Sequence, residues 1–188
     1  MSATKHADTA KILKEILRLN LARQDFIGVQ RLAEKLLAHP VHPSNLIFRP
    51  LMAGIDTTYS RSFGQNDGIR PLGKSFTVFN DRSLDDTHGK LLRLRHGAYA
   101  HRDTSAVGTF TGTDTDKSYQ LQIRFDDSEN PSLCSNAPEL DPENLQNVVK
   151  LCSFQSQRAL DAARKLLALV TKGKKYAPGT YTAGVDFP

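Results

Sequence analysis

Four polar side chains with complementary chemistry lie close together in the middle of the sequence. Arg95 and His101 are six positions apart, and Arg102 and Asp103 directly follow His101. An imidazole near its unperturbed pKa can take the proton from a ribose 2′-hydroxyl or give one to a leaving oxygen, while a guanidinium stabilises charge that develops on phosphate oxygens. These residue types predict that RNA is cleaved with no metal ion and no other cofactor.

The same segment resembles the signature of HEPN domains, in which an arginine is followed, after four to six residues, by a histidine. The residue after that arginine is typically Asn, Asp or His, and here it is His96. The wider run from Thr87 to Asp103 resembles the branch of the superfamily related to abortive-infection proteins. The run from Tyr59 to Phe63 resembles it more loosely.

This resemblance implies a mainly α fold, an antiparallel bundle of four to five helices, which frequently forms homodimers. It also implies a metal-independent endoribonuclease of toxin–antitoxin or phage-defence systems, with Arg95 and His101 as catalytic residues, RNA as substrate and an antitoxin protein as partner. Other HEPN members have lost catalysis and bind nucleic acid, a nucleotide or a partner protein. That binding module is the alternative interpretation.

Further residues around the motif are expected to support catalysis or to contact RNA. His88 lies seven positions before Arg95, on nearly the same helix face and about 10 Å away. Tyr59 is a candidate for stacking on a base and Arg61 for holding a phosphate. The alternative for these residues is a structural role, as a core histidine and as the packing edge of a helix. The complete set of supporting residues is His96, Arg102, Asp103, His88, Tyr99, Tyr59 and Arg61.

The spacing of Arg95 and His101 raises a geometric problem. Six steps on an ideal helix turn about 600°, equivalent to about 240°, so the two side chains do not share a face. Either the helix loosens near Gly97 or ends before His101, or two copies meet across a two-fold axis so that paired motifs build one cleft. The family resemblance favours the second solution.

A second motif, Gly68–Ser75, matches the literal phosphate-loop string G-x-x-x-x-G-K-[ST]. That loop binds phosphate only between a buried strand and the start of a helix. The preceding residues are polar without alternation, and the following residues 76–79 favour an extended conformation. We therefore expect an irregular surface loop over residues 64–80 and no nucleotide site.

Apolar residues at three- and four-residue steps predict the helices that position the motif. The first covers residues 8–38, with Gly28 as a point of division, and the second covers residues 45–63, with Pro50 as its start or a kink. A third helix, over residues 83–101, starts with a capping box from Ser83 and Asp86 and carries the motif. A final helix opens at residues 141–143 and closes at Lys172 and Gly173.

Between the third and final helices the pattern changes. Residues 107–111 and 119–125 alternate apolar and polar side chains around a turn rich in Gly, Asp and Thr, which predicts a small inserted β-hairpin over residues 107–125. Residues 126–140 are expected to form a polar loop. We expect residues 1–173 to form one domain and residues 174–188 a loosely ordered tail.

Composition sets wider limits. The 188 residues are 39% hydrophobic and carry a formal charge of +5, which suits a single globular domain and favours contact with polyanions such as RNA. Cys134 and Cys152 suggest neither a zinc site nor a disulfide framework, and His39 and His42 suggest a surface connection and no metal site. The absence of a leader or a long apolar run predicts a cytoplasmic protein with no membrane partner.

Overall fold

The structure of the chain is a computed structural model. It describes residues 3–42, 45–64, 70–94, 120–124, 132–136 and 144–173, and for residues 3–8 and the two strands only the backbone. Within these ranges the prediction of a mainly helical bundle is confirmed.

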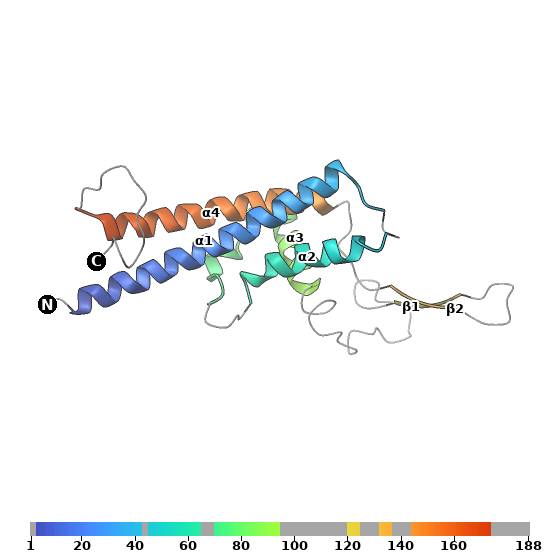
Figure 1. Cartoon of the computed structure of the whole chain (residues 1–188), viewed down its shortest axis with the longest axis horizontal. Coiled ribbons are helices and arrows are strands. Elements are labelled where there is room, and N and C mark those ends of the chain that lie inside the picture. The colour runs from blue at the N-terminus through green and yellow to red at the C-terminus, as the bar shows by residue number, and fades with distance from the viewer. Residues whose placement is uncertain are drawn as a thin grey trace.

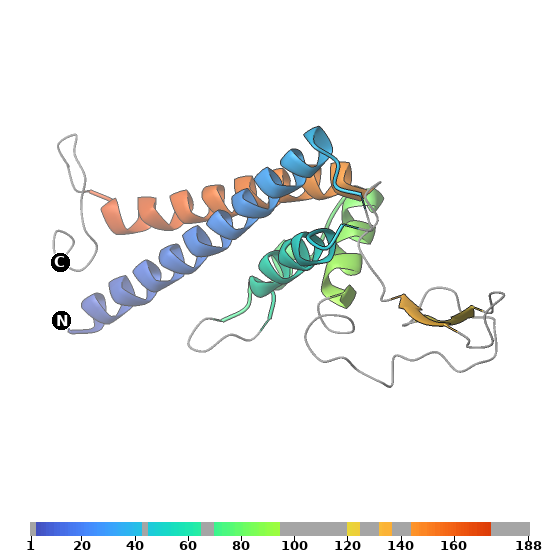
Figure 2. The ribbon, with the colours of Figure 1, turned by 45° about the vertical axis from the view of Figure 1, so that its right-hand side comes forward.

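Two long helices form the frame of the molecule. Helix α1 (Ala3–Ala38) and helix α4 (Leu145–Thr171) run antiparallel along each other, so the beginning of α1 and the end of α4 lie at the same end of the molecule (Figure 1). With 36 residues, α1 is about 54 Å long at the usual rise per residue. The two shorter helices pack near the end of α1 and the start of α4. Toward the start of α1 the pair extends well beyond them, as Figure 2 shows.

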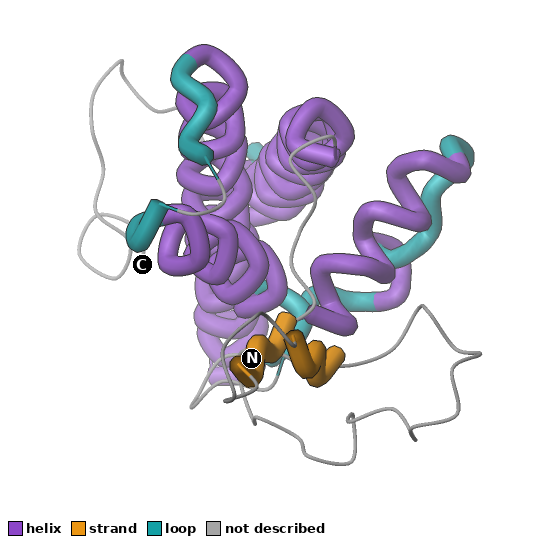
Figure 3. The backbone as a smooth tube through the Cα atoms, turned by 90° about the vertical axis from the view of Figure 1, so that its right-hand side faces the viewer, coloured by secondary structure: helices purple, strands orange, loops and turns teal. Residues whose placement is uncertain are grey.

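The two shorter helices cover one side of this pair. Helix α2 (Phe48–Arg61) runs back along α1, and helix α3 (Arg82–Leu94) packs against both α2 and α4. A 3₁₀ turn, Lys74–Phe76, lies in the connection between them. Viewed nearly end-on, the helices do not lie in one plane, so they enclose a shared core (Figure 3).

The core explains why these segments are helical. Its α1 members follow one another at steps of three and four residues, which places them on one face: Leu19, Ala22, Phe26, Val29, Ala33 and Leu36. They meet Met52, Ile55 and Tyr59 of α2, Leu91 of α3, and Val148 and Leu151 of α4. Among the α1 residues before Leu19 whose side chains are described, 9–18, none belongs to this core.

The helix boundaries correct several details of the sequence prediction. Helix α1 is continuous through Gly28, and Pro50 lies in the first turn of α2, where its missing amide costs no hydrogen bond. The start of α3 is capped by Asp81, whose Oδ1 accepts the backbone amide of Ser83 at 2.8 Å, so the expected capping box from Ser83 is wrong. Gly173 has φ 77° just after α4, as predicted for a helix-terminating glycine.

The strand region differs from the expectation. Strand β1 (Gln120–Arg124) pairs antiparallel with β2 (Ser132–Asn136), in a register that places Gln122 opposite Cys134. The prediction of a polar loop over residues 126–140 is therefore wrong for residues 132–136, which form β2. The sequence does not reveal this strand because main-chain pairing does not require alternating apolar and polar side chains. The predicted hairpin over residues 107–125 stays a prediction, because residues 107–119 lie outside those described.

Candidate functional site

The motif itself follows directly after the described part of α3. Leu94 is the last described residue of that helix, and Arg95, His96, Tyr99, His101, Arg102 and Asp103 lie outside the described residues. The junction between α2 and α3 leads into the motif, and it contains the other three predicted site residues, His88, Tyr59 and Arg61.

His88 lies inside the core. Its side chain is 5% exposed, and its Nδ1 lies 2.8 Å from the hydroxyl of Tyr59, with which it shares a hydrogen bond. Burial lowers the pKa of His88 below its usual value, against a smaller opposing effect of Asp85. The imidazole is therefore neutral at pH 7 and presents no surface to RNA in this conformation.

Tyr59 is the centre of an aromatic cluster that surrounds this hydrogen bond. Its ring is fully buried, 5.4 Å from the ring centroid of Phe26 and 5.3 Å from that of Phe63. The imidazole of His88 lies edge-on to Phe63 at 4.7 Å and tilted against Phe79 at 5.1 Å. Burial raises the pKa of Tyr59 far above its usual value. With no exposed face, this ring has no place for a base to stack.

A second polar contact anchors α3 one turn from its described end. The Oγ of Ser60, also buried, donates to the main-chain oxygen of Leu91 at 3.2 Å. Together with the Tyr59–His88 bond, it fixes the position of α3 relative to α2 on either side of Gly89 and Lys90. The residue that begins the motif, Arg95, therefore follows a helix held by two buried hydrogen bonds.

Asp56 is a buried carboxyl group at the same junction. It has no exposed surface, and neither of its oxygens has a hydrogen-bond partner among the described residues. Burial raises the pKa of Asp56 from 3.8 to about 8, although Lys90 lowers it in part. The carboxyl is thus mostly protonated at pH 7, since a buried carboxylate without partners would be much less stable.

The segment after α2 is attached to α4 by two side chains. Nε2 of Gln155, fully buried, donates to the main-chain oxygen of Phe76 at 2.7 Å. The guanidinium of Arg158 lies over the rings of Phe154, Phe76 and Phe79, at 5.0, 5.4 and 5.8 Å from their centroids. The same group donates to the main-chain oxygens of Val78, at 3.2 Å, and Ser75.

Arg61 lies at the surface end of α2. Its side chain is 59% exposed and forms an ion pair with Asp25 of α1, with its Nε 3.0 Å from the carboxylate. The pKa of Arg61 is raised, mainly by this hydrogen bond. Of the three predicted residues at this junction, Arg61 is the one whose charged group reaches solvent.

The described part of the phosphate-loop string lacks the geometry that binds phosphate. Residues 70–73 have no regular structure, and the 3₁₀ turn at Lys74–Phe76 stands where a long helix would have to begin. Within the described ranges, no three His, Cys, Asp or Glu side chains are placed to share a metal ion. Nor is any described helix both long and apolar enough to cross a membrane.

Sequence reasoning missed the buried polar residues Asp56 and Gln155 and the half-buried Arg158. A usable signal existed for the first two, because Asp56 lies four positions after Met52 and three before Tyr59, and Gln155 lies three after Cys152 and four before Ala159. Both therefore share the apolar face of their helices.

No family model, curated protein or solved structure matches this chain.

Proposed function

We propose that this chain is an endoribonuclease that cleaves single-stranded RNA without a metal ion, with Arg95 and His101 as its catalytic residues. The observation that supports this proposal most is the position of the motif. Arg95 directly follows α3, and α3 is anchored by the Tyr59–His88 and Ser60–Leu91 hydrogen bonds. Catalytic side chains need a rigid element of this kind to hold them in position. The end of a surface helix that has no function needs no such anchoring.

In the proposed step, His101 takes the proton from the 2′-hydroxyl as this oxygen attacks the adjacent phosphorus. The bond from phosphorus to the 5′-oxygen breaks, the leaving oxygen takes a proton from water, and His101 then returns its proton to the solvent, which gives a 2′,3′-cyclic phosphate and a 5′-hydroxyl end. Arg95 stabilises the additional charge on the phosphate oxygens. Unpaired RNA is the proposed substrate because its backbone can reach the in-line arrangement that a duplex restricts.

We further propose that two copies build the cleft. The 240° between Arg95 and His101 on an ideal helix keeps one copy from directing both side chains at one phosphate, and a two-fold axis near the continuation of α3 would pair the motifs. A molar mass of two chains in light scattering at micromolar concentration is the expected result. A monomer that cleaves RNA would contradict this part of the proposal.

The structural positions of His88 and Tyr59 refine the proposal. Both are buried, so in this account they hold α3 and do not touch RNA. His96, Tyr99, Arg102 and Asp103 remain the proposed supporting residues beside the catalytic pair, and Arg61 the proposed phosphate contact. The net charge of +5 agrees with a polyanionic substrate. The family resemblance adds an antitoxin protein as a proposed partner.

The deciding experiment incubates the purified chain with a broad pool of single-stranded RNA, with and without a chelator. Cleavage that persists with the chelator and leaves 2′,3′-cyclic phosphate ends supports the proposed chemistry. Cleavage that stops with the chelator contradicts it. Binding of RNA without any cleavage would favour the alternative, a non-catalytic module for nucleic acid, a nucleotide or a partner protein.

A further inference from the structure

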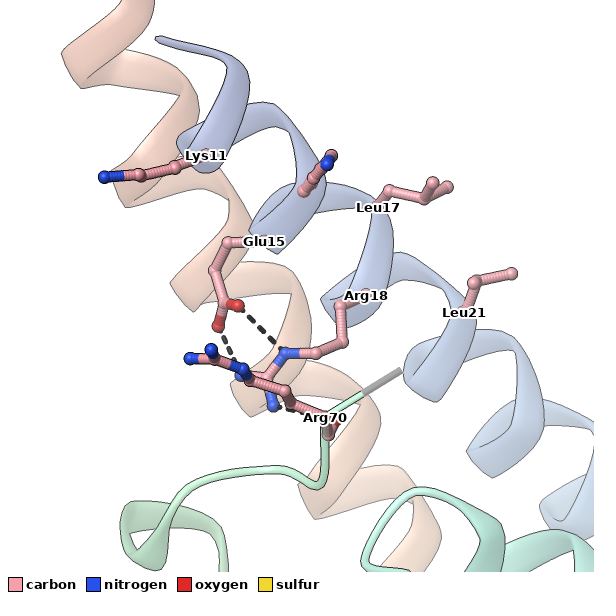
Figure 4. Close-up of a pocket in the computed structure, with 7 residues that line it drawn as sticks. Lys11, Glu15, Leu17, Arg18, Leu21 and Arg70 are labelled. Carbon is pink, nitrogen blue, oxygen red and sulfur yellow. Dashed lines mark hydrogen bonds and ion pairs between the residues drawn. The ribbon is translucent and has the colours of Figure 1, made fainter. Parts of the chain in front are cut away.

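A groove lies beside the first half of α1. It has a volume of about 850 Å³ and lies between α1 and the segment that follows α2. Six of its lining residues are on successive turns of α1 and one is on the segment: Lys11, Lys14, Glu15, Leu17, Arg18, Leu21 and Arg70. We call this surface the α1 groove (Figure 4).

The α1 groove carries an excess of positive charge. Its described lining has four cationic side chains and one acid, and that acid, Glu15, is paired with Arg18, whose Nε donates to it at 2.9 Å. Lys11, Lys14 and Arg70 are exposed and form no ion pair with any described residue. Within the described part of the chain, three cations therefore remain to pair with a ligand.

Arg18 also gives the groove a fixed wall. Its guanidinium donates to the main-chain oxygens of Arg70, at 3.2 Å, and Pro71, which attaches the segment after α2 to α1. The side chain of Arg18 is only 16% exposed. Figure 4 shows Glu15 and Arg18 turned toward Arg70, so the charged wall is held in place before any partner binds.

The groove also has an apolar side. Leu17 and Leu21, four positions apart, project from the same side of α1 and are 58% and 38% exposed. The core residues of α1 begin at Leu19, on another face, so no part of the described core covers these two side chains. A pair of exposed leucines at helical spacing beside unpaired cations is typical of a surface that receives another helix.

We propose that the α1 groove binds an acidic amphipathic helix of a partner protein. Apolar side chains of that helix would cover Leu17 and Leu21, and its carboxylates would pair with Lys11, Lys14 and Arg70. This proposal is independent of RNA cleavage. Single-stranded RNA fits less well, because no described residue that lines the groove is aromatic and could stack on a base. A second copy of this chain fits less well too, because a two-fold axis through the groove would oppose like charges.

The proposal can be tested with a synthetic peptide as the partner. The probe is a helical peptide of about 20 residues with leucines at i and i+4 spacing and glutamates beside them. Its control is the same peptide with each glutamate replaced by glutamine, which leaves the protein itself unchanged. We expect the full chain to bind the acidic peptide at least ~10-fold more tightly than its control in fluorescence anisotropy, and less tightly as salt rises.

Two double variants locate the site. Lys11→Glu with Lys14→Glu, and Leu17→Ser with Leu21→Ser, should each weaken binding of the acidic peptide ~10-fold or more, since all four side chains are exposed or nearly so. Arg31→Glu with Lys35→Glu, exposed further along α1, is the matched charge control, and Leu169→Ser on α4 is the apolar control. Both controls should bind as the wild type does.

Three results would overturn the proposal. One is affinity for the acidic peptide weaker than about 1 mM, or equal for the glutamine control. Another is unchanged binding by both groove variants. The third is evidence that the groove serves a different ligand, while neither the wild type nor any variant binds the peptide. That evidence would be loss of RNA oligonucleotide binding in the lysine variant, or loss of dimerisation in the leucine variant. None of these results depends on whether the chain cleaves RNA.

Discussion

The hydroxyl of Tyr59 on α2 and Nδ1 of His88 on α3 lie 2.8 Å apart inside an aromatic cluster that excludes water from both. This pair joins the two helices about two turns before Arg95, where the proposed catalytic segment begins. Because the histidine is neutral and buried, it serves to position α3 relative to α2. Its spacing from Arg95 in the sequence suggests a different role, contact with RNA.

Removing the hydroxyl should destabilise the fold. Tyr59→Phe keeps the ring packing and leaves a buried imidazole nitrogen without its partner, which typically costs about 1–3 kcal/mol in the free energy of unfolding. Urea denaturation measures this loss. Thr57→Ala, which deletes an exposed hydrogen bond from the same helix to the main-chain oxygen of Ala53, should cost much less. Equal losses in the two variants would contradict a positioning role for the pair.

Asp56 should make stability fall as pH rises. Its folded-state pKa of about 8 lies above its unfolded value of 3.8, so its stabilising contribution is complete below about pH 4 and is lost progressively up to about pH 8. Asp56→Asn removes this dependence, and the wild type should lose up to about 1.4 kcal/mol per pH unit relative to the variant in that window. At pH 8 the variant should be the more stable protein.

In that pH window, the free energy of unfolding of the wild type must be compared with that of Asp56→Asn, because the pH slope of the wild type alone contains other contributions. The lowered pKa of His88 acts in the opposite direction, since stability falls as pH drops below the unfolded histidine value of 6.5. Both proteins share His88, so its effect cancels in the difference. Thermal unfolding from pH 4 to pH 8 provides the data, with Asp86→Asn, at an exposed site, as control. Parallel curves for wild type and Asp56→Asn would refute the predicted titration.

Arg158 should be a stabilising residue that lysine cannot replace. Loss of three ring contacts and of hydrogen bonds to two main-chain oxygens predicts a cost of about 1–3 kcal/mol for Arg158→Ala. Arg158→Lys keeps the charge and loses the planar fork, so it should recover less than half of that cost. Denaturation and limited proteolysis of residues 70–80 measure both effects. Arg164→Ala, exposed on α4, should behave as wild type; full recovery by lysine would show that charge alone matters.

Gly28 offers a stabilising substitution. It lies inside α1 with ordinary helical geometry, and a Cβ built there meets nothing within 4 Å. Gly28→Ala should therefore raise the free energy of unfolding by about 1 kcal/mol, because alanine loses less backbone entropy in a helix. Gly173→Ala is the opposite case, since its φ of +77° disfavours a side chain, and it should lower the melting temperature. A lower melting temperature for Gly28→Ala would indicate that α1 bends there in solution.

Helical periodicity predicts most of the helices. It does not predict which small residues join the core or which side chain caps a helix, because tertiary packing and local geometry determine both. The steps between Leu19, Val29 and Leu36 identify α1 from sequence, whereas the small side chains of Ala22 and Ala33, which are buried in the same core, give no comparable apolar signal. The spacing of Ser83 and Asp86 fits a capping box and predicts Ser83 as the cap of α3, whereas in the structure the carboxylate of Asp81 accepts the amide of Ser83. Local patterns do not show which of two neighbouring polar side chains is oriented toward the helix end.

The candidate site was predictable in its residue types and less so in their surroundings. Spacing along one helix suggested that His88 faces a cleft, but Phe63 and Phe79 come from other segments and enclose it. The buried state of Asp56 depends in the same way on contacts between helices. Such enclosure is a property of the assembled bundle, so no spacing rule within one helix can reveal it.

The central claim is that His101 and Arg95 cleave RNA, and single-turnover cleavage of a single-stranded RNA tests it most directly. His101→Ala should slow cleavage by on the order of 10²- to 10⁴-fold while the chain remains folded, because a positioned acid–base group usually contributes that much. Arg95→Ala should also slow turnover strongly, whereas Lys165→Ala, at an exposed position on α4, should leave the cleavage rate unchanged. Equal cleavage by wild type and His101→Ala, or no cleavage by the wild type across a broad RNA pool, would contradict the claim.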